Sequence, residues 1–420
     1  MYTTIEDVQL VPAVELNRRG GLPRLATRLR SGEGIHLGFL GGSITLGEGY
    51  RPRLTAWMQE KWLNCQIFHT NAGIGGTGSI LGAFRVGDNL LSHPHKPDVV
   101  LVEFAVNDHG GTTPQQCADS FEGIIRQIIR QAPGADICLL YTVSPPIKEK
   151  LQEGKCSWTN SIMEKIADHY GLPSINFGPE VLRREQAGEL AYQAAWKSAE
   201  EAAARAQGQA IFSFDSVHPT LGEGHLLYMD VLKRSLEPLL EVNESVGERT
   251  LPPALYPDNW ENACMKPLSR IERIGDWKRL RLADDGLRHP SEIYLPELWK
   301  AETPGAALRF RFSGSVLGIF GCVGPKSCQL RLTVDGIERQ PLVMFDSYCT
   351  HSRGWRVHYA LTPENFGCGG HEAVLKIDSR QPDKTAILAQ KNITIDNPAD
   401  YDGTICYLGA ILACGDVKQP

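Results

Sequence analysis

The sequence predicts an α/β domain with a parallel sheet between two layers of helices, followed by an antiparallel β-sandwich. The first 240 residues alternate short apolar runs with helix-like segments, a pattern typical of strand–helix repeats around a parallel sheet. After about residue 270 the helical period ends, and short alternating runs separated by Gly and Pro follow, as in sandwiches. With 420 residues, the chain also exceeds the roughly 250–300 residues at which a single core stops growing.

Five apolar runs in the first part of the chain are predicted strands. They are continuous rather than alternating, which is typical of parallel strands buried on both faces. They cover Ile35–Leu40, Cys65–Asn71, Val99–Phe104, Ile137–Val143 and Ser174–Phe177.

The segments between these runs are predicted helices, and the clearest is Thr113–Gln131. Thr113 occupies an N-cap position, Pro114 the first helical position, and Gln116 the position that completes a capping box. An apolar stripe follows at helical spacing, made of Phe121, Ile124, Ile125, Ile128 and Ile129. The Ala- and Glu-rich stretch Ala191–Ala206 predicts a second helix.

The second part of the chain is organised differently. The stretch "VNESVGERTLPPALYPDN" is rich in proline without periodicity and predicts a linker. We therefore expect a catalytic-type domain over 1–245 with an N-terminal extension of about 30 residues, a linker over 246–270, and a sandwich over 271–420. Asp335-Gly336 after "QLRLTV" predicts a hairpin turn.

Composition narrows the function classes. Hydrophobic residues make up 42% of the chain and charged residues 22%. The net charge of −6 argues against a broad nucleic-acid-binding surface or a polybasic membrane patch. No apolar stretch approaches the roughly 20 residues of a membrane span. The start of the chain lacks the features of a secretory leader, so a cytoplasmic protein is expected, with a processed secreted form left open. The 11 scattered cysteines fit reduced, structural thiols.

The stretch "FLGGSITLGEGY" ends the first predicted strand with two glycines and Ser43. Function in parallel sheets lies at the carboxyl ends of the strands. Glycines there allow a sharp turn that leaves the serine hydroxyl uncovered, and the N–H groups of such a turn can bind an anion. The ordinary alternative is a turn followed by a helix cap.

A serine nucleophile needs a base, and "FSFDSVHPTLGEGH" supplies one. Asp215 and His218 lie three residues apart in this stretch. One short turn can then deliver an imidazole together with the carboxylate that orients it. The alternative is a capping Asp and a polar loop His. A zinc site is disfavoured because only two ligands are close together, so no metal is expected.

Acyl chemistry also needs donors for an oxyanion. "NAGIGGTGS" follows the second predicted strand, and the N–H of Gly76 is one candidate donor. "VEFAVNDHG" follows the third, and the Asn107 side chain is another; an Asn-Asp pair after a strand is otherwise an ordinary turn. "GIGGTG" lacks the lysine of a phosphate loop and the acidic residue of a dinucleotide site, so no cofactor is expected.

Taken in order, "GGSIT", "NAGIGGTGS", "EFAVND" and "DSVHP" resemble the four sequence blocks of the SGNH (GDSL-like) hydrolases. The resemblance covers roughly residues 30–240 and implies a flavodoxin-like α/β/α fold. It implies Ser43 as nucleophile and oxyanion donor, Gly76 and Asn107 as the other donors, His218 as general base and Asp215 as its orienting carboxylate.

Two departures from the family pattern bear on these assignments. Gly42 precedes the serine where the family name expects Asp, and Gly73, Gly75 and Gly78 compete with Gly76 for the donor role. The other common serine-hydrolase motif, Gly-x-Ser-x-Gly, is not met because Thr45 replaces its last glycine.

The family resemblance implies esterases, lipases, thioesterases and acyltransferases. An SGNH domain followed by a jelly-roll-like module resembles carbohydrate esterases that remove O-acetyl groups, so an acetylated oligosaccharide or polysaccharide is the expected substrate. Aromatics of the second domain could stack on sugars or belong to its core; they are Trp299, Tyr348 and Trp355, with His351 nearby. Sugar acyl transfer, short-chain lipase or thioesterase activity, and glycan binding without catalysis remain alternatives, and the sequence leaves homo-oligomerisation open.

Overall fold

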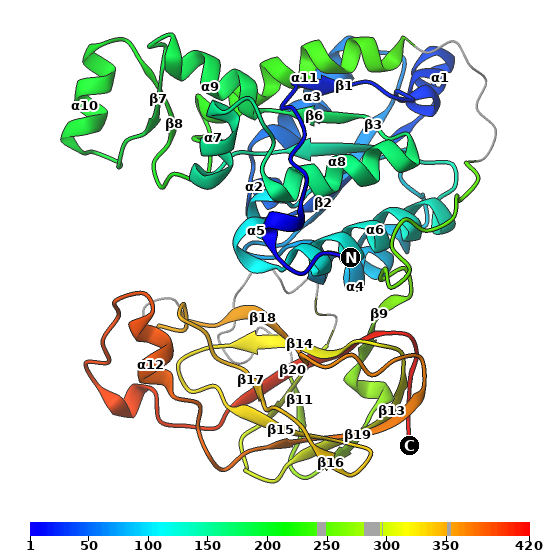
Figure 1. Cartoon of the computed structure of the whole chain (residues 1–420), viewed down its shortest axis with the longest axis vertical. Helices are drawn as coiled ribbons and strands as arrows, with labels where there is room; N and C mark the ends of the chain where they lie inside the picture. Colours follow the sequence, from blue (N-terminus) through cyan, green and yellow to red (C-terminus); the bar gives the residue numbers. More distant parts are fainter. Residues whose placement is uncertain (242–248, 281–294, 296, 351–353) are drawn as a thin grey trace. The chain divides into compact units, whose positions relative to one another are not determined.

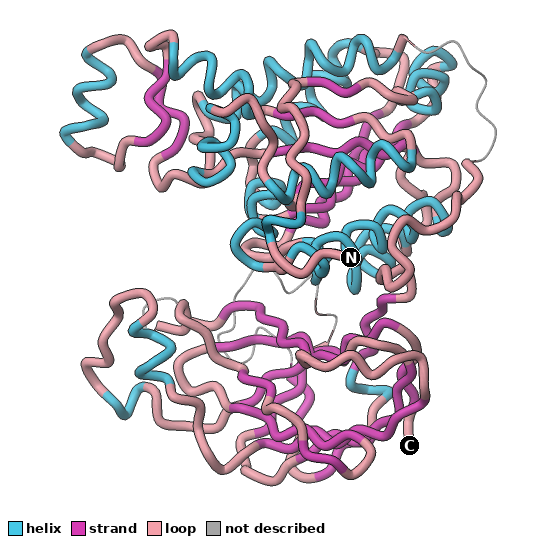
Figure 2. The backbone as a smooth tube through the Cα atoms, viewed as in Figure 1, coloured by secondary structure: helices cyan, strands magenta, loops and turns pink. Residues whose placement is uncertain are grey.

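The computed structural model describes residues 1–241, 249–280, 295, 297–350 and 354–420. These residues form two compact units, Met1–Glu261 and Asn262–Pro420. Strands lie among many helices in the first unit, whereas strands dominate the second (Figure 2). The predicted α/β domain and the predicted antiparallel β domain are both confirmed.

The first unit is built on a six-stranded sheet in the order β1–β6–β5–β4–β2–β3. Its strands are β1 (Leu16–Asn17), β2 (Ile35–Gly41), β3 (Ile67–Gly73), β4 (Val99–Glu103), β5 (Asp136–Tyr141) and β6 (Ser174–Asn176). Strands β2 to β6 are parallel, and β1 pairs with β6 in the antiparallel direction. Without β1, the parallel strands have the flavodoxin-like order 2-1-3-4-5.

Helices cover both faces of this sheet (Figure 1). α1 (Pro23–Ser31), α3 (Tyr50–Lys61) and α11 (Gly224–Leu240) pack together on one face. α4 (Ser79–Val86), α6 (Pro114–Gln131) and α8 (Trp158–Tyr170) pack together on the other. The described part of this unit also contains the α-helices α2 (Ser43–Leu46), α5 (Ala105–Gly111), α7 (Pro145–Gln152), α9 (Gly178–Gln186) and α10 (Ala199–Ala206), a 3-10 helix at Ile5–Asp7 and a π-helical turn at Gly87–Leu91.

Helix α6 forms as its sequence predicts. The side chain of Thr113 accepts a hydrogen bond from the backbone N–H of Gln116, and the reciprocal half of the capping box is also present. The predicted apolar stripe is buried along its whole length, with no member more than 3% exposed. Burial of one long face against α4 and α8 fixes this helix to the sheet.

The helix predicted over Ala191–Ala206 is wrong in its first half. Residues Leu190–Gln193 form strand β7, which pairs in parallel with β8 (Ala210–Ser213), and α10 starts only after Ser198. Lys197 has a φ of 59°, which ends the extended segment before the helix, and the Ser198 side chain caps it. We call β7, α10 and β8, residues 190–213, the side lobe; it extends to one side of its unit (Figure 1).

The segment expected as a linker is packed where the structure describes it. The backbone N–H groups of Leu255 and Tyr256 donate to the buried carboxylate of Glu122 on α6, at 2.6 and 2.7 Å. Further along, Ala263–Pro267 forms strand β9, which pairs with β20. A proline-rich stretch without periodicity therefore marks irregular backbone here rather than a free connection.

The second unit consists of two antiparallel sheets. One has the order β10–β13–β19–β15–β16, with β17 beside β15 and β21 beside β13, and the other has the order β11–β12–β20–β14–β18, with β9 beside β20. The strands are β10 (Glu272–Ile274), β11 (Lys278–Leu280), β12 (Leu298–Ala301), β13 (Ala307–Ser313), β14 (Leu317–Val323), β15 (Gln329–Val334), β16 (Ile337–Glu338), β17 (Leu342–Val343), β18 (Arg356–Leu361), β19 (Gly370–Ile377), β20 (Cys406–Cys414) and β21 (Val417–Lys418), with helix α12 at Lys384–Ala389.

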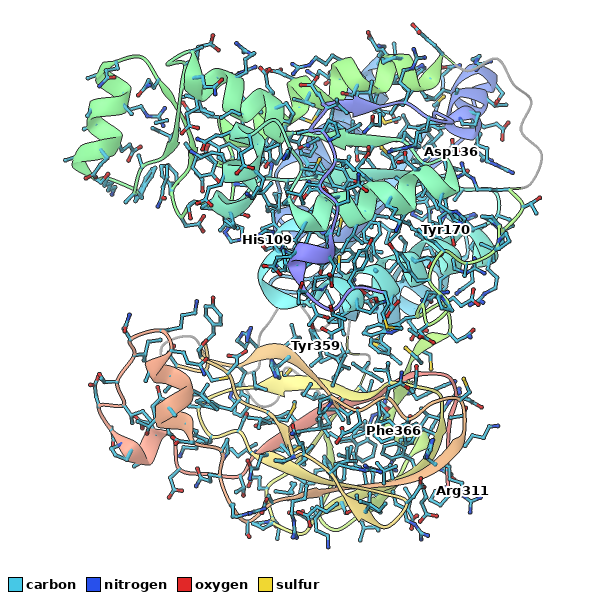
Figure 3. All side chains as sticks on the ribbon, viewed as in Figure 1. His109, Asp136, Tyr170, Arg311, Tyr359 and Phe366 are labelled. Carbon is cyan, nitrogen blue, oxygen red and sulfur yellow. The ribbon has the colours of Figure 1, made fainter. Side chains whose placement is uncertain are left out.

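In the second unit, the alternating sequence pattern places apolar side chains in the core and polar side chains towards solvent, as predicted. On β13, Phe310 and Phe312 are buried while Arg311 between them is exposed. Figure 3 labels Arg311 at the edge of the second unit. One apolar core collects side chains from both sheets, as in a sandwich. The predicted hairpin at Asp335-Gly336 joins β15 to β16, with φ of 53° and 77° at these two residues, values typical of a type I′ turn.

Candidate active site

Ser43 follows β2 at the point where the sheet changes its winding direction. Strand β2 lies between β3 and β4. The strand order reverses there, so the chain connections on the two sides of β2 run in opposite directions. Such a reversal leaves a crevice at the carboxyl ends of the strands. Ser43 is the first residue of α2, after Gly42 as the cap. The first N–H groups of a helix have no partner within it, so the Ser43 N–H is free of the helical ladder.

The two glycines before Ser43 serve close packing. A Cβ on Gly41 would lie 2.3 Å from Thr45 Oγ1, and a Cβ on Gly42 would lie 2.0 Å from Asn107 Oδ1. Neither residue has a positive φ, so the turn itself does not demand glycine. The aspartate that the family name expects at position 42 would therefore displace Asn107, a predicted oxyanion donor.

Ser43, His218 and Asp215 form one chain of hydrogen bonds. His218 Nε2 lies 2.7 Å from Ser43 Oγ, and His218 Nδ1 lies 2.6 Å from Asp215 Oδ2. The His218 and Asp215 side chains are 49% and 56% exposed, so solvent and a ligand can reach them. The structure thus brings together the three residues that the sequence suggested as nucleophile, base and orienting acid.

Asp215 is held in its ionised form. Partial burial raises its pKa, but hydrogen bonds from the His218 ring and from the backbone N–H groups of His218 and Val217 outweigh it, and the pKa falls from 3.8 to about 2. The two backbone donors contact Asp215 Oδ1 at 2.8 and 3.0 Å. The carboxylate therefore stays charged beside the imidazole at any ordinary pH.

The turn that carries Asp215 and His218 is anchored at both ends. It follows β8, whose last residue, Ser213, donates its hydroxyl hydrogen to the His218 carbonyl at 2.8 Å. The Tyr192 hydroxyl of β7 donates to the Ser216 carbonyl at 2.9 Å. Ser216 has a φ of 71°, a left-handed conformation that closes the turn tightly.

Gly76 and Asn107 lie beside the nucleophile turn. Gly76 has a φ of 71°, and a Cβ placed on it would face open space, whereas a Cβ on the adjacent Gly75 would lie 3.7 Å from the Ser43 Cβ. Asn107, on α5, lies next to Gly42, where a Cβ would come within 2.0 Å of Asn107 Oδ1. The N–H of Ser43, the N–H of Gly76 and the Asn107 amide are thus the candidate donors around one site.

The competing glycines of this loop have packing roles. A Cβ on Gly73 would lie 2.4 Å from the backbone nitrogen of Leu46, and a Cβ on Gly78 would lie 2.1 Å from Asp108 Oδ1. Both positions exclude a side chain because neighbouring groups already fill the space. Among the glycines from 73 to 78, Gly76 combines a left-handed conformation with an open side.

A buried carboxylate beneath the nucleophile turn was not found from the sequence. Glu103 ends β4 and is 1% exposed. It accepts hydrogen bonds from Thr142 Oγ1 at 2.8 Å and from Thr45 Oγ1 at 2.9 Å. Burial raises its pKa from 4.5 to about 7 despite these bonds. A charged residue inside the otherwise apolar run "VVLVEF" was the signal for it.

A buried guanidinium supports the same turn. Arg85 on α4 is fully buried and donates to the Ala72 carbonyl at 2.6 Å and the Gly41 carbonyl at 3.1 Å. These carbonyls end β3 and β2, so one side chain ties together the two strand ends that flank Ser43. The sequence analysis gave no sign of this role.

The titration of Glu103 makes the stability of the fold dependent on pH. Its pKa is raised in the folded chain, so its stabilising effect is complete below about pH 4.5 and is lost as pH rises through about 7. The expected loss is at most ~3 kcal/mol of unfolding free energy. In Glu103→Gln, the unfolding free energies from urea curves near pH 5 and near pH 8 should differ less than in the wild type. An equal difference in both proteins would contradict the raised pKa of Glu103.

Among the described residues of the first unit, one hollow adjoins the hydrogen-bonded chain. A pocket of about 720 Å³ lies beside His218 and is also lined by Trp196, Phe214 and Leu221. A larger hollow of about 1230 Å³ lies at the opposite, amino-terminal ends of the strands, beside Gly34, Pro97 and Ala135. The smaller pocket is the relevant one because it contains the imidazole and its carboxylate.

The aromatic residues noted in the second domain are mostly packed. The Trp355 ring lies 4.3 Å from the Tyr407 ring, and the Arg273 guanidinium lies 4.0 Å from the centre of Trp299. Tyr348 is 39% exposed, and His351 lies outside the described residues. These contacts indicate that the rings pack within the second unit or at its edge rather than forming an open surface for sugars to stack on.

The described residues contain no cluster of three or more His, Cys, Asp or Glu side chains arranged to hold a metal ion. Among the helices in the described part of the chain, none has both the length and the apolar character that crossing a bilayer requires.

Comparisons with known proteins bear on the fold and on the sequence of the first unit. No curated protein matches the chain. Two similar solved structures are of a two-domain esterase (CEX) active on acetylated mannans. The first, co-crystallised with mannopentaose, has a TM-score of 0.69 and 21% identity, covering 98% of this chain and 99% of that one. The second has a TM-score of 0.66 and 20% identity, covering 96% and 99%.

At such identities these two structures show a shared two-domain fold and no more. The match to a family is separate and rests on sequence. Residues 39–223 match the family described as GDSL-like Lipase/Acylhydrolase, a span that includes Ser43, Gly76, Asn107, Asp215 and His218. This stretch of the first unit is therefore similar to the GDSL-like lipase/acylhydrolase family.

Proposed function

We propose that this protein is a serine esterase that removes O-acetyl groups from carbohydrates through an acyl-enzyme. The observation that carries the proposal is the continuous hydrogen-bonded chain from Asp215 through His218 to Ser43. A serine hydroxyl becomes a nucleophile when an imidazole removes its proton, and the carboxylate stabilises the resulting charge. All the groups required lie in the first unit.

Acylation begins with attack of Ser43 Oγ on the ester carbonyl carbon. The hydroxyl proton passes to His218 Nε2, and Asp215 stabilises the imidazolium through Nδ1–H. The carbonyl oxygen becomes an oxyanion, which accepts hydrogen bonds from the N–H groups of Ser43 and Gly76 and from the Asn107 amide. Collapse of this intermediate breaks the ester bond, and the sugar alcohol leaves with the proton from His218.

Deacylation repeats the same steps with water. His218 Nε2 takes a proton from a water molecule, which attacks the acetyl carbon bound to Ser43 Oγ. The second oxyanion uses the same three donors. Acetate then leaves, and Ser43 recovers its proton from His218.

The choice of acetyl and carbohydrate has its own support. The solved two-domain esterase that shares this fold is described as active on acetylated mannans, which guides the choice of substrates to test. The open, half-exposed triad suits a bulky, soluble alcohol component better than a buried acyl chain. A role of the second domain in holding the glycan is part of the proposal.

The decisive experiment combines product analysis with detection of the intermediate. Acetate release is measured on acetylated mannan, xylan and amino-sugar oligomers, and the reaction is acid-quenched during turnover for peptide mass spectrometry. We expect acetate release from at least one oligomer and one acetyl group on the peptide containing Ser43. An acetyl group found on a different residue, or none at any quench time, would contradict the mechanism.

The oxyanion assignment predicts a specific loss. Asn107→Ala removes one of three donors, so kcat should fall by roughly 10²–10³ with a small change in KM. The effect belongs in kcat because the oxyanion exists only after attack. Steady-state rates on p-nitrophenyl acetate measure it, with Asn64→Ala before β3 as the matched control. A kcat within about threefold of wild type would remove Asn107 from the site.

A further inference from the structure

The pocket beside His218 is built by two segments. Its lining includes the apolar side chains of Trp196, Phe214 and Leu221, which come from the side lobe and the turn after β8. It also includes Arg205 of α10 and Glu223, which form an ion pair with each other. The side lobe is thus directly connected to the catalytic turn, because β8 leads into Asp215.

Trp196 is an exposed aromatic residue held in place. Its side chain is 63% exposed, whereas tryptophan is usually largely buried. The Phe214 ring lies 4.9 Å away at an angle of 77°, and the next residue, Lys197, has a fixed left-handed φ of 59°. Trp196 therefore presents an exposed, oriented aromatic surface in the lining of the same pocket as His218.

The proposed reaction determines whether the alcohol or the acyl component of the ester lies beside His218. His218 Nε2 takes the proton from Ser43 and gives it to the leaving alcohol. The leaving oxygen must therefore approach His218, while the carbonyl oxygen points to the donors at Gly76 and Asn107. The group attached to the leaving oxygen is then on the His218 side of the ester bond, and His218 and Asp215 both line this pocket.

The composition of the pocket fits a sugar ring. A pyranose presents an apolar face of C–H groups, which packs on aromatic rings, and an edge of hydroxyls, which bind charged side chains. Trp196 and Phe214 supply the rings, and Arg205 and Glu223 supply the charged edge. An acyl chain would make no use of the Arg205–Glu223 pair and would lie on the wrong side of His218.

We propose that Trp196, supported by Phe214, forms the subsite for the sugar ring whose hydroxyl leaves in the reaction. The inference rests on the proposed esterase function and adds a residue that selects the alcohol component. Trp196 belongs to the side lobe, so the lobe is a specificity element and Trp196 touches substrate without taking part in proton transfer.

The test separates the sugar from the ester bond. Trp196→Ala and Trp196→Tyr are compared with wild type on acetylated manno-oligosaccharides and on ethyl acetate, whose alcohol is too small to reach Trp196. We expect kcat/KM for the sugar esters to fall about 3- to 10-fold in Trp196→Ala, to recover largely in Trp196→Tyr, and to stay unchanged for ethyl acetate. Phe68→Ala, an exposed aromatic of β3 at the opposite end of the sheet, is the matched control.

Two results would overturn the inference. One is an equal fall on both substrates, which would indicate a structural role. The other is a selective loss on ethyl octanoate relative to ethyl acetate, which would make the pocket an acyl site.

Binding decides the inference separately from turnover. In the Ser43→Ala background, calorimetry with acetylated manno-oligosaccharides should show affinity reduced about 3- to 10-fold by Trp196→Ala. If wild type released no acetate while this difference was found, the proposed function would fail and the subsite would stand. Equal affinities would reject the subsite even in an active esterase.

Discussion

Replacing Ser43 with alanine is expected to lower kcat for acetyl esters by about 10⁶-fold, as in other serine hydrolases that lose their nucleophile. Without Oγ no acyl-enzyme forms, and only the oxyanion donors and substrate binding remain to assist direct attack by water. The Ser43 hydroxyl is hydrogen-bonded to the half-exposed His218 ring rather than to a group of the core, so the fold should survive. Initial rates on p-nitrophenyl acetate and acetate release from acetylated oligomers measure the loss.

Ser31→Ala, at the exposed end of α1, is the matched control and should retain full activity. The acetylated Ser43 peptide must also vanish in Ser43→Ala. Wild-type and Ser43→Ala proteins with equal rates would favour the alternative of a glycan-binding protein with an inert hydrolase domain.

Asp215→Asn should lower kcat by about 10⁴-fold, the second largest effect. Asp215 Oδ2 fixes the His218 tautomer in which Nε2 can accept the serine proton, and its charge stabilises the imidazolium. An asparagine that donates its amide hydrogen to Nδ1 would leave the proton on Nε2, where it blocks the base. KM should change little because Asp215 contacts no group of the substrate in the proposed mechanism.

The sign of the Asp215 shift determines the pH at which this comparison should be made. The lowered pKa, about 2, means that the contribution of Asp215 to stability is complete above about pH 4 and is lost as pH falls towards 2. Activity and folding can therefore be compared near pH 7 without titration of Asp215. Asp230→Asn on α11, an exposed carboxylate paired with Arg184, is the control; a kcat for Asp215→Asn equal to that of the control would contradict the role.

The sequence predicted the parts of the fold that depend on local patterns. Continuous apolar runs indicated the five parallel strands because burial on both faces leaves little room for polar residues. The apolar stripe and the capping box predicted the bounds of α6 to within one residue. Ser43 could be assigned because function in a parallel sheet lies at the carboxyl ends of the strands. The Asp215–His218 pair could be assigned because one short turn can carry an imidazole together with its orienting carboxylate.

Other features depend on contacts that the sequence does not display. Glu103 and Arg85 support the nucleophile turn from β4 and α4, and both are buried only because the sheet and helix meet there. The prediction of helix over β7 was wrong because its Ala-rich surroundings have high helix propensity, whereas its pairing with β8 decides the structure. Helix propensity is overridden wherever a neighbouring strand supplies the hydrogen bonds.

The short turn after β8 has a consequence for how activity fails. Asp215 accepts hydrogen bonds from both the ring and the backbone N–H of His218, so these two residues move together. A displacement of their turn relative to the sheet therefore changes the distance between His218 Nε2 and Ser43 Oγ. Gentle heating or mild denaturant should thus inactivate the enzyme reversibly by parting these two atoms, while the imidazole keeps its carboxylate and the pair returns intact on cooling.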